Sequence, residues 1–162
     1  SLAMQFPEIV KKLIVVDIAP KAYKPGHLDI FDAILNLDIS KFQTRGEIDE
    51  NIKEKLPDFG VRQFILKNLG RNSDGSFFWK MNVKGIFNSY EDIIADLKIE
   101  HTFEKNTLFI KGSLSKYIKE SDYGKIHALF PNSVIKEVEG AGHWVHAEAP
   151  DKVIDLISDF IK

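Results

Sequence analysis

The chain has 162 residues, of which 44% are hydrophobic and 28% charged, a composition that is typical of a globular domain and excludes a disordered segment. Its 22 basic and 24 acidic residues are scattered and leave a net charge of -2, so the sequence has no basic stripe for nucleic acid and no acidic tail. The chain contains no cysteine, which fits a reducing compartment and makes the cytoplasm the expected location. Its apolar runs are far shorter than the roughly 20 residues of a membrane span, so no membrane contact is expected.

The first strand and a helical insertion are expected in the N-terminal part of the chain. Residues 12–17 form an apolar, β-branched run that ends on an acid, which indicates a strand buried on both faces of a parallel sheet. From residue 28 to residue 97 the sequence has helical spacing of its apolar residues in place of strand-like runs. Helices are expected over residues 28–37, 46–56, 61–69 and 83–94, and a polar turn cluster at 72–76 leads into a partly alternating, strand-like stretch.

The rest of the chain alternates between strands and helices. Residues 107–112 repeat the buried strand pattern, and residues 133–140 alternate between apolar and polar, as in a strand near the edge of a sheet. A helix is predicted between them, over residues 123–131. Another is predicted over residues 151–161, directly after Pro150.

The order of these elements predicts the fold class and the domain organisation. We expect an α/β fold with about three parallel strands and flanking helices, in which residues 1–27 and 98–162 form one partial core. Residues 28–97 form a helical subdomain inserted into it. Ligands of parallel sheets bind at the C-terminal ends of the strands, so the loops after the strands are where chemistry is expected.

The most informative stretch is residues 140–150, Gly-Ala-Gly-His-Trp-Val-His-Ala-Glu-Ala-Pro, between the last strand and the last helix. It resembles the histidine loop of the α/β-hydrolase family, in which a Gly-x-Gly-His motif follows the final strand. The resemblance implies that His143 is the catalytic base, which takes the proton of a nucleophile and later returns it to the leaving group. A capping or packing role is the alternative for His143, and the neighbouring His146 cannot point the same way.

Two further segments resemble the small esterases and acyl-ester hydrolases of that family. Residues 15–20, Val-Val-Asp-Ile-Ala-Pro, are similar to the strand that follows the nucleophile's helix, and residues 109–118 are similar to the next strand and its loop. The resemblance implies that Asp17 orients the histidine and that Ser115 is a second hydrogen-bond partner. Turn chemistry is the alternative for both, and Asp122 is a later candidate acid.

The family's nucleophile elbow, Gly-x-Ser-x-Gly, does not occur in the sequence. Residues 3–10 resemble the end of the helix that follows this elbow, so the resemblance places the nucleophile shortly upstream of them. One donor of the oxyanion hole belongs to the residue after the nucleophile and is missing with it. We therefore predict the C-terminal fragment of a serine hydrolase that cleaves carboxylic esters or thioesters, with negligible activity of the chain alone.

Two alternatives remain open. One is a non-catalytic ligand-binding module with the same fold, and the other is a relative of the dehalogenases and epoxide hydrolases, which use an aspartate nucleophile. The residue at the upstream elbow would distinguish all three. Neither a metal nor a cofactor is expected, because His143 and His146 have no clear third ligand and no phosphate-cradling glycine loop is present.

The resemblance also implies a substrate region and an oligomeric contact. The helical insertion corresponds to the family's lid, and its aromatic composition suits an apolar ester substrate. Phe78, Trp79 and Trp144 are candidate substrate contacts, with core packing as the alternative. In the family another strand flanks the one at residues 12–17, so without it an apolar edge is exposed, and we expect self-association through that edge.

Overall fold

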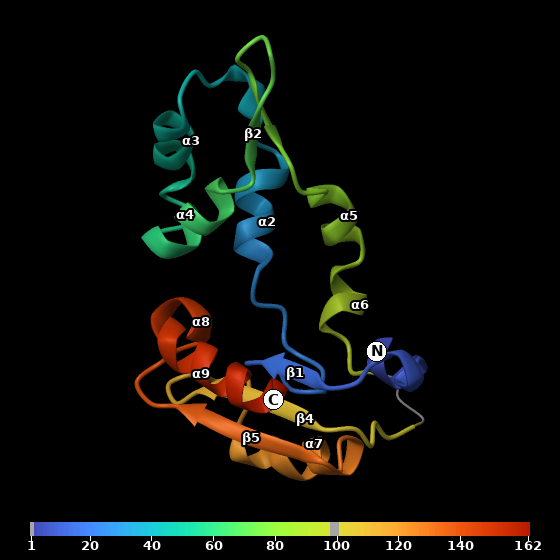
Figure 1. Ribbon diagram of the computed structural model, residues 1–162. Coiled ribbons are helices and arrows are strands. Elements are labelled where there is room, and N and C mark those ends of the chain that lie inside the picture. The colour runs from blue at the N-terminus through green and yellow to red at the C-terminus, as the bar shows by residue number, and fades with distance from the viewer. Residues whose placement is uncertain (1, 98–100) are drawn as a thin grey trace. The chain divides into compact units, whose positions relative to one another are not determined.

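The computed structural model describes residues 2–97 and 101–162, and the chain divides into two compact units (Figure 1). Unit 1 consists of Ser1–Ala22 and Asp96–Lys162, and unit 2 consists of Tyr23–Ala95. Residues 98–100, at which the second part of the expected core begins, lie outside the described residues. No helix in the described part of the chain is long and apolar enough to cross a membrane.

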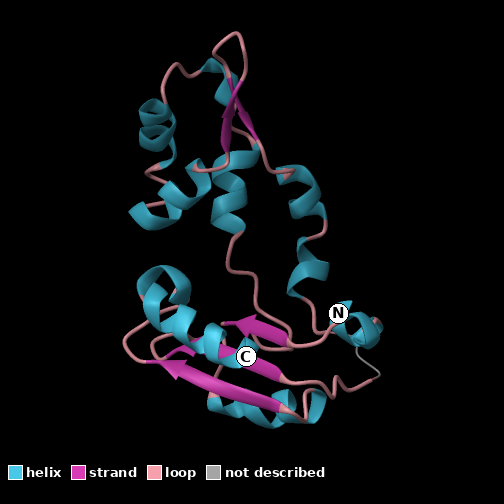
Figure 2. Cartoon of the chain, viewed as in Figure 1, coloured by secondary structure: helices cyan, strands magenta, loops and turns pink. Residues whose placement is uncertain are grey.

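Unit 1 is built on a parallel sheet with the strand order β1–β4–β5, which confirms the expected α/β class (Figure 2). The strands are β1 (Leu13–Val16), β4 (Thr107–Gly112) and β5 (Ser133–Val138). All six residues of the central strand β4 are buried, whereas β1 and β5 are only partly covered. The first strand was expected to be buried on both faces, but Leu13, Ile14 and Val15 are only partly buried and Val16 is exposed. Within the described residues it pairs on one side only, with β4.

Helices pack on both faces of this sheet because successive side chains of β4 point to opposite sides. Phe109 joins the cluster under α7 (Tyr123–Leu129), and its neighbours Leu108 and Ile110 join the cluster under α9 (Pro150–Ile161). Helix α7 ends two residues before Pro131, since the residue before a proline is disfavoured in the helical conformation. The smaller helical turns of unit 1 are α1 (Leu2–Gln5), η1 (Pro7–Ile9), η3 (Glu120–Asp122) and α8 (Val145–Glu148).

Unit 2 consists of short helices and one hairpin around its own apolar core. Its elements are α2 (Leu28–Leu35), η2 (Ile39–Lys41), α3 (Arg45–Ile52), α4 (Phe59–Leu66), β2 (Leu69–Arg71), β3 (Phe77–Trp79), α5 (Val83–Asn88) and α6 (Tyr90–Ile94). A capping box between Thr44 and Glu47 starts α3. The fully buried side chains of Ile48, Ile52 and Leu66 lie at the centre of the core.

Three predicted helices of unit 2 differ from the structure. The helix expected over residues 46–56 ends at Ile52. The helix expected over residues 61–69 ends at Leu66, and the chain continues into β2 of an antiparallel hairpin with β3. A Cβ atom on Gly70 would lie 2.3 Å from the ring of Phe78, so the hairpin needs glycine there. The helix expected over residues 83–94 is two helices, α5 and α6, which meet at Ser89.

The chain passes from unit 1 to unit 2 after residue 22 and returns after residue 95, and ion pairs and a hydrogen bond hold these two points. In unit 1, Lys21 forms an ion pair with Asp122, and Asp96 forms one with Lys125 at 2.6 Å. Both partners belong to η3 or α7. In unit 2, the backbone N–H of Tyr23 donates to the carbonyl of Ile94 at 2.8 Å. Unit 2 is therefore an insertion whose entry and exit points are neighbours.

Candidate active site

Three loops at one edge of the sheet of unit 1 carry the candidate catalytic residues. Asp17 follows β1 directly, Ser115 lies in the loop after β4, and His143 lies in the loop after β5. The strands are parallel, so their C-terminal ends meet at the same edge. The structure brings these three side chains, which are distant in the sequence, into direct contact.

Asp17 is the centre of this group. Its side chain is fully buried, with Oδ1 accepting the backbone N–H of Gly112 at 3.2 Å and Oδ2 accepting both the Ser115 hydroxyl and His143 Nδ1. The backbone N–H of Asp17 donates to the carbonyl of Ile110 at 2.7 Å, which extends the β1–β4 pairing as far as the acid. Its φ of 47° lies in the left-handed region, which aspartate tolerates better than most residues. The sheet therefore fixes the carboxylate in place.

His143 connects this buried carboxylate to the surface. Nδ1 lies 2.7 Å from Asp17 Oδ2, and 45% of the His143 side chain is exposed against 1% of the Asp17 side chain. Because an ionised carboxylate only accepts hydrogen bonds, Nδ1 carries the proton in this contact. The other ring nitrogen, Nε2, is then the one that can accept a proton in the neutral imidazole. This is the arrangement of a general base held by an acid.

The loop that carries His143 is held by its backbone. A Cβ atom on Gly112 would lie 2.2 Å from the carbonyl oxygen of Gly142 and 2.3 Å from that of Ala141, so the end of β4 must be glycine for this loop to approach. The Glu148 carboxylate of α8 accepts the backbone N–H of Gly142 at 2.8 Å. Gly140 has a φ of 74°, a conformation that glycine adopts without strain. The loop therefore presents His143 in one backbone conformation.

Tyr117 covers the imidazole. Its ring stacks on the ring of His143 with 3.8 Å between the ring centroids and 11° between the planes. The backbone N–H of Tyr117 donates to the Ser115 hydroxyl oxygen at 3.2 Å. Tyr117, Gly112 and Glu148 carry no motif of their own in the sequence. Their only signal is that all three lie within the segments that carry the resemblance to known hydrolases.

The alternative candidates have other surroundings. His146 is exposed on α8. Asp122 is engaged by Lys21 and by the backbone N–H of Lys119, which it accepts at 2.8 Å. Burial acts to raise the pKa of Asp122, but the Lys21 ammonium and the Lys119 N–H outweigh it and hold the pKa below its usual value. Asp122 thus anchors Lys21.

The three candidate substrate contacts lie in three different environments. Trp144 directly follows His143 and precedes α8, where it is partly buried. Trp79 packs against the core of unit 2, and its indole N–H is buried without an acceptor among the described residues. Phe78, on the other face of β3, lies over Gly70 and is 41% exposed. Substrate contact by these residues stays a prediction.

The group formed by Asp17, Ser115 and His143 has the geometry of an acid–base site. Among residues 2–97 and 101–162, no cluster of three or more His, Asp or Glu side chains is placed to hold a metal ion. The geometry suits proton transfer at Nε2 of His143, with Asp17 as the partner that stabilises the protonated ring. A nucleophile elbow is not part of this sequence.

Comparison with known proteins identifies similar chains along almost the whole sequence. No family model matches. The chain is 36% identical over 153 residues to the esterase YbfF of Escherichia coli, covering 94% of this chain and 58% of that protein. It is 35% identical over 167 residues to the sn-1-specific diacylglycerol lipase ABHD11 of Danio rerio, covering 99% and 51%. The structure of a marine microorganism esterase matches with a TM-score of 0.93 and 34% identity, covering 98% of this chain and 63% of that one. The chain spans about half the length of the curated relatives that it matches.

Proposed function

We propose that this chain, which belongs to the α/β-hydrolase family and has the fold of its C-terminal portion, supplies the base and the orienting acid of a hydrolase for carboxylic esters or thioesters. The observation that carries the proposal is the 2.7 Å contact between Nδ1 of the half-exposed His143 and the buried Asp17. The similar proteins are named as esterases and lipases, which supports ester hydrolysis in general.

In the proposed reaction, a serine hydroxyl attacks the acyl carbon of the ester and gives its proton to Nε2 of His143. Asp17 accepts the Nδ1–H bond throughout and stabilises the imidazolium that forms. The proton then passes from Nε2 to the leaving alcohol or thiol as the acyl bond to it breaks. A water molecule repeats the sequence on the acyl-enzyme and releases the acid. Ser115 shares Oδ2 of Asp17 and keeps the carboxylate aligned with the ring.

The nucleophile itself is proposed to belong to a part of the protein outside this sequence. The missing Gly-x-Ser-x-Gly motif and the half-length match to relatives support this assignment. The chain alone is then expected to have negligible esterase activity, because a base without nucleophile and oxyanion donors recovers little of a triad's acceleration.

The cytoplasm remains the proposed location of the protein.

The decisive experiment compares the chain with the full translation product of its gene, using short-chain alkyl esters and thioesters. The full product should turn over these substrates, and His143→Ala should lower kcat/KM by roughly 10³-fold or more. His146→Ala, three residues away and exposed, is the matched control and should stay within about twofold of the unchanged protein, an ordinary effect for a surface position. Full activity of the His143→Ala protein would refute the assignment of the base. Robust turnover by the 162-residue chain that disappears in His143→Ala would refute the external nucleophile.

Unit 2 is proposed to be the lid of this hydrolase, as its place in the sequence implies. Its aromatic residues suit a substrate with an apolar acyl group. Phe78 and Trp79 of this unit are the candidate contacts, together with Trp144 of unit 1. Replacing each by alanine in the full product should raise KM more for long acyl chains than for acetyl esters, whereas residues that only fill a core should change stability and not chain-length preference.

Self-association of the chain alone is proposed to occur through the edge of β1. Within the described residues β1 pairs only with β4, and exposed large apolar side chains gather in the segment around it. They are Leu2, Phe6, Ile9, Val16 and Ile18. A second copy of the chain offers the same apolar edge, so two copies can pair. Light scattering at tens of micromolar should show a dimer or larger species, and a Val16→Lys chain should be monomeric. A clean monomer of the unchanged chain would exclude this contact.

A further inference from the structure

Two different contacts hold the imidazole of His143. The hydrogen bond from Nδ1 reaches Asp17 at 2.7 Å and engages one atom of the ring. The stack with Tyr117 engages a whole face of it, with 3.8 Å between centroids and 11° between planes. The two contacts come from different loops, after β1 and after β4, neither of which carries the histidine itself.

These contacts restrict the ring in complementary ways. The second torsion of a histidine side chain is broad and roughly twofold, so the ring can both rock and turn over. A hydrogen bond at Nδ1 distinguishes the two turned-over states, because only one of them presents Nδ1 to Asp17. It limits rocking only weakly, since hydrogen bonds tolerate a range of angles. A flat aromatic neighbour limits rocking, because tilting the imidazole breaks its contact with the Tyr117 ring.

Contacts of the neighbouring residues Ser115 and Ile118 fix the position of Tyr117. Its N–H donates to the hydroxyl oxygen of Ser115, and that hydroxyl in turn donates to Asp17. The next residue, Ile118, is 1% exposed and packs in the cluster under α7. One short loop therefore contacts the acid through Ser115 and the base through Tyr117. The exposed side of His143 would otherwise be free to move, since 45% of its side chain faces solvent.

We propose that Tyr117 is a positioning residue for the base: its ring sets the plane of the His143 imidazole and so the direction in which Nε2 accepts the proton. This inference rests on the proposed role of His143 as the base. Tyr117 acts through the imidazole and takes no part in proton transfer. The aromatic face performs this function, so phenylalanine should replace tyrosine there and aliphatic residues should not.

The test follows the proton on Nδ1 of His143 by ¹⁵N-edited NMR of the histidine-labelled 162-residue chain. The unchanged chain should show an Nδ1–H signal that His143→Ala and Asp17→Asn both remove. Tyr117→Leu should speed solvent exchange of this proton by about two- to tenfold, as expected from the loss of an aromatic pair. Tyr117→Phe should leave the exchange rate unchanged. Lys116→Ala, at the exposed neighbouring position, is the matched control and should also leave it unchanged.

Each outcome has a separate meaning. If the unchanged chain shows no Asp17-dependent Nδ1–H signal, the acid–base pair of the proposed function fails. If the signal is present but Tyr117→Leu leaves its exchange unaltered, only the positioning role of Tyr117 fails. Equal effects of the Phe and Leu variants would assign the role to the hydroxyl and overturn the stacking argument. Tyr117→Met provides a second ring-free variant if Tyr117→Leu loses the backbone amide signals of β4, and it should give the same acceleration.

Discussion

Each of the two units buries a charged side chain, and the two charges are used differently. In unit 2, Arg62 is 5% exposed and donates to Asp49 at 2.6 Å and to the backbone carbonyls of Leu56 and Pro57. In unit 1, the fully buried Asp17 is bonded to His143, a titratable side chain that is 45% exposed. A buried charge bonded to an acid and to backbone carbonyls holds a fold together, whereas one bonded to a half-exposed imidazole has the form of a working site.

The difference can be tested most strongly at Asp17. Asparagine has nearly the same shape and also tolerates a positive φ, so Asp17→Asn should preserve the fold. Its amide presents a donor as well as an acceptor and favours the wrong tautomer of His143, which should lower kcat/KM of the nucleophile-bearing protein by about 10²- to 10⁴-fold. Kinetics with short-chain esters and circular dichroism measure the two effects. A variant that unfolds without a selective loss of activity would make Asp17 a structural residue, like Arg62.

The corresponding change in unit 2 is Arg62→Ala. Removing the guanidinium leaves Asp49 and two carbonyls without their buried donor, which should destabilise unit 2 by about 3–5 kcal/mol. The Asp17–His143 contact lies in unit 1 and should be retained. Hydrogen exchange of the α3 and α4 amides, compared with the histidine Nδ1–H signal, separates these effects. The exposed Arg45→Ala on α3 is the control and should cost less than about 1 kcal/mol.

The approach of the histidine loop to β4 provides a third test. In Gly112→Ala the new methyl group would meet two backbone carbonyls at 2.2 and 2.3 Å, so the loop must shift, at a cost of about 1–3 kcal/mol. We expect weaker Nδ1–H protection at His143 as well as a lower melting temperature. Gly124→Ala in α7, where nothing lies within 4 Å of the new atom, should instead be neutral or slightly stabilising. Equal behaviour of the two variants would show that the loop is not held against β4.

The smallest expected effect is that of pH on the Lys21–Asp122 pair. The folded-state pKa of Asp122 is lowered, so its contribution to stability is present above the unfolded pKa of about 4 and is lost as the pH falls through the folded value. Asp122→Asn should therefore be less stable than the unchanged chain at pH 7, by under about 1 kcal/mol, and the gap should close below pH 4. Urea denaturation across this range measures it. Asp155→Asn, on the exposed side of α9, should show no such pH-dependent gap.

Local patterns predicted the fold class because each strand of unit 1 has its signal within a few adjacent residues. The run at 107–112 is apolar enough to specify a central strand, and the structure buries all six of its residues. In unit 2 the same reasoning extended a predicted helix to residue 69, whereas α4 ends at Leu66. Leu69 continues the helical spacing, but it belongs to a hairpin whose pairing with Trp79 depends on a turn further along the chain.

The candidate site shows a similar division. His143 and Asp17 were proposed from short motifs, and the structure places them in contact, although their roles stay a prediction. Tyr117 lies 26 residues before His143, and no periodicity or spacing connects an aromatic residue in one loop to an imidazole in another. The steric requirement at Gly112 likewise arises only when the two loops meet in space.

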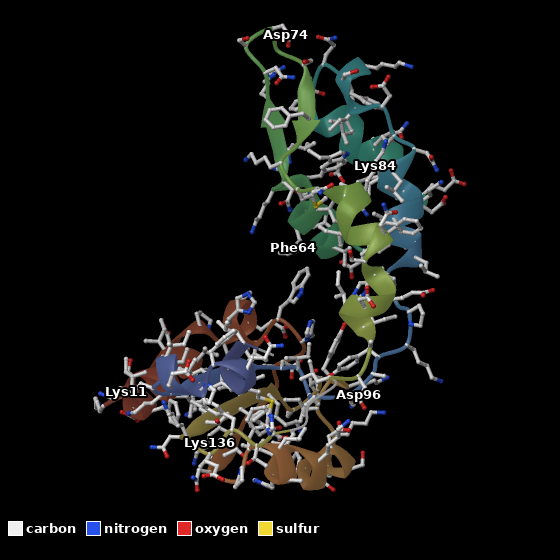
Figure 3. All side chains as sticks on the ribbon, turned by 90° about the vertical axis from the view of Figure 1, so that its right-hand side faces the viewer. Lys11, Phe64, Asp74, Lys84, Asp96 and Lys136 are labelled. Atoms are coloured by element: carbon white, nitrogen blue, oxygen red, sulfur yellow. The ribbon has the colours of Figure 1, made fainter. Side chains whose placement is uncertain are left out.

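Because the chain enters and leaves unit 2 at neighbouring positions, unit 2 can be replaced by another segment. Residues 22 and 96 belong to unit 1, and Lys21 and Asp96 anchor them to η3 and α7. Figure 3 labels Asp96 at the end of the inserted unit. Within unit 2, Tyr23 and Ile94 are hydrogen-bonded to each other. A few glycine or serine residues joining position 22 to position 96 should therefore replace unit 2 without stretching the sheet. Chimeras built at these two positions would carry another insertion on the same unit 1, and they would test whether the proposed lid sets substrate preference.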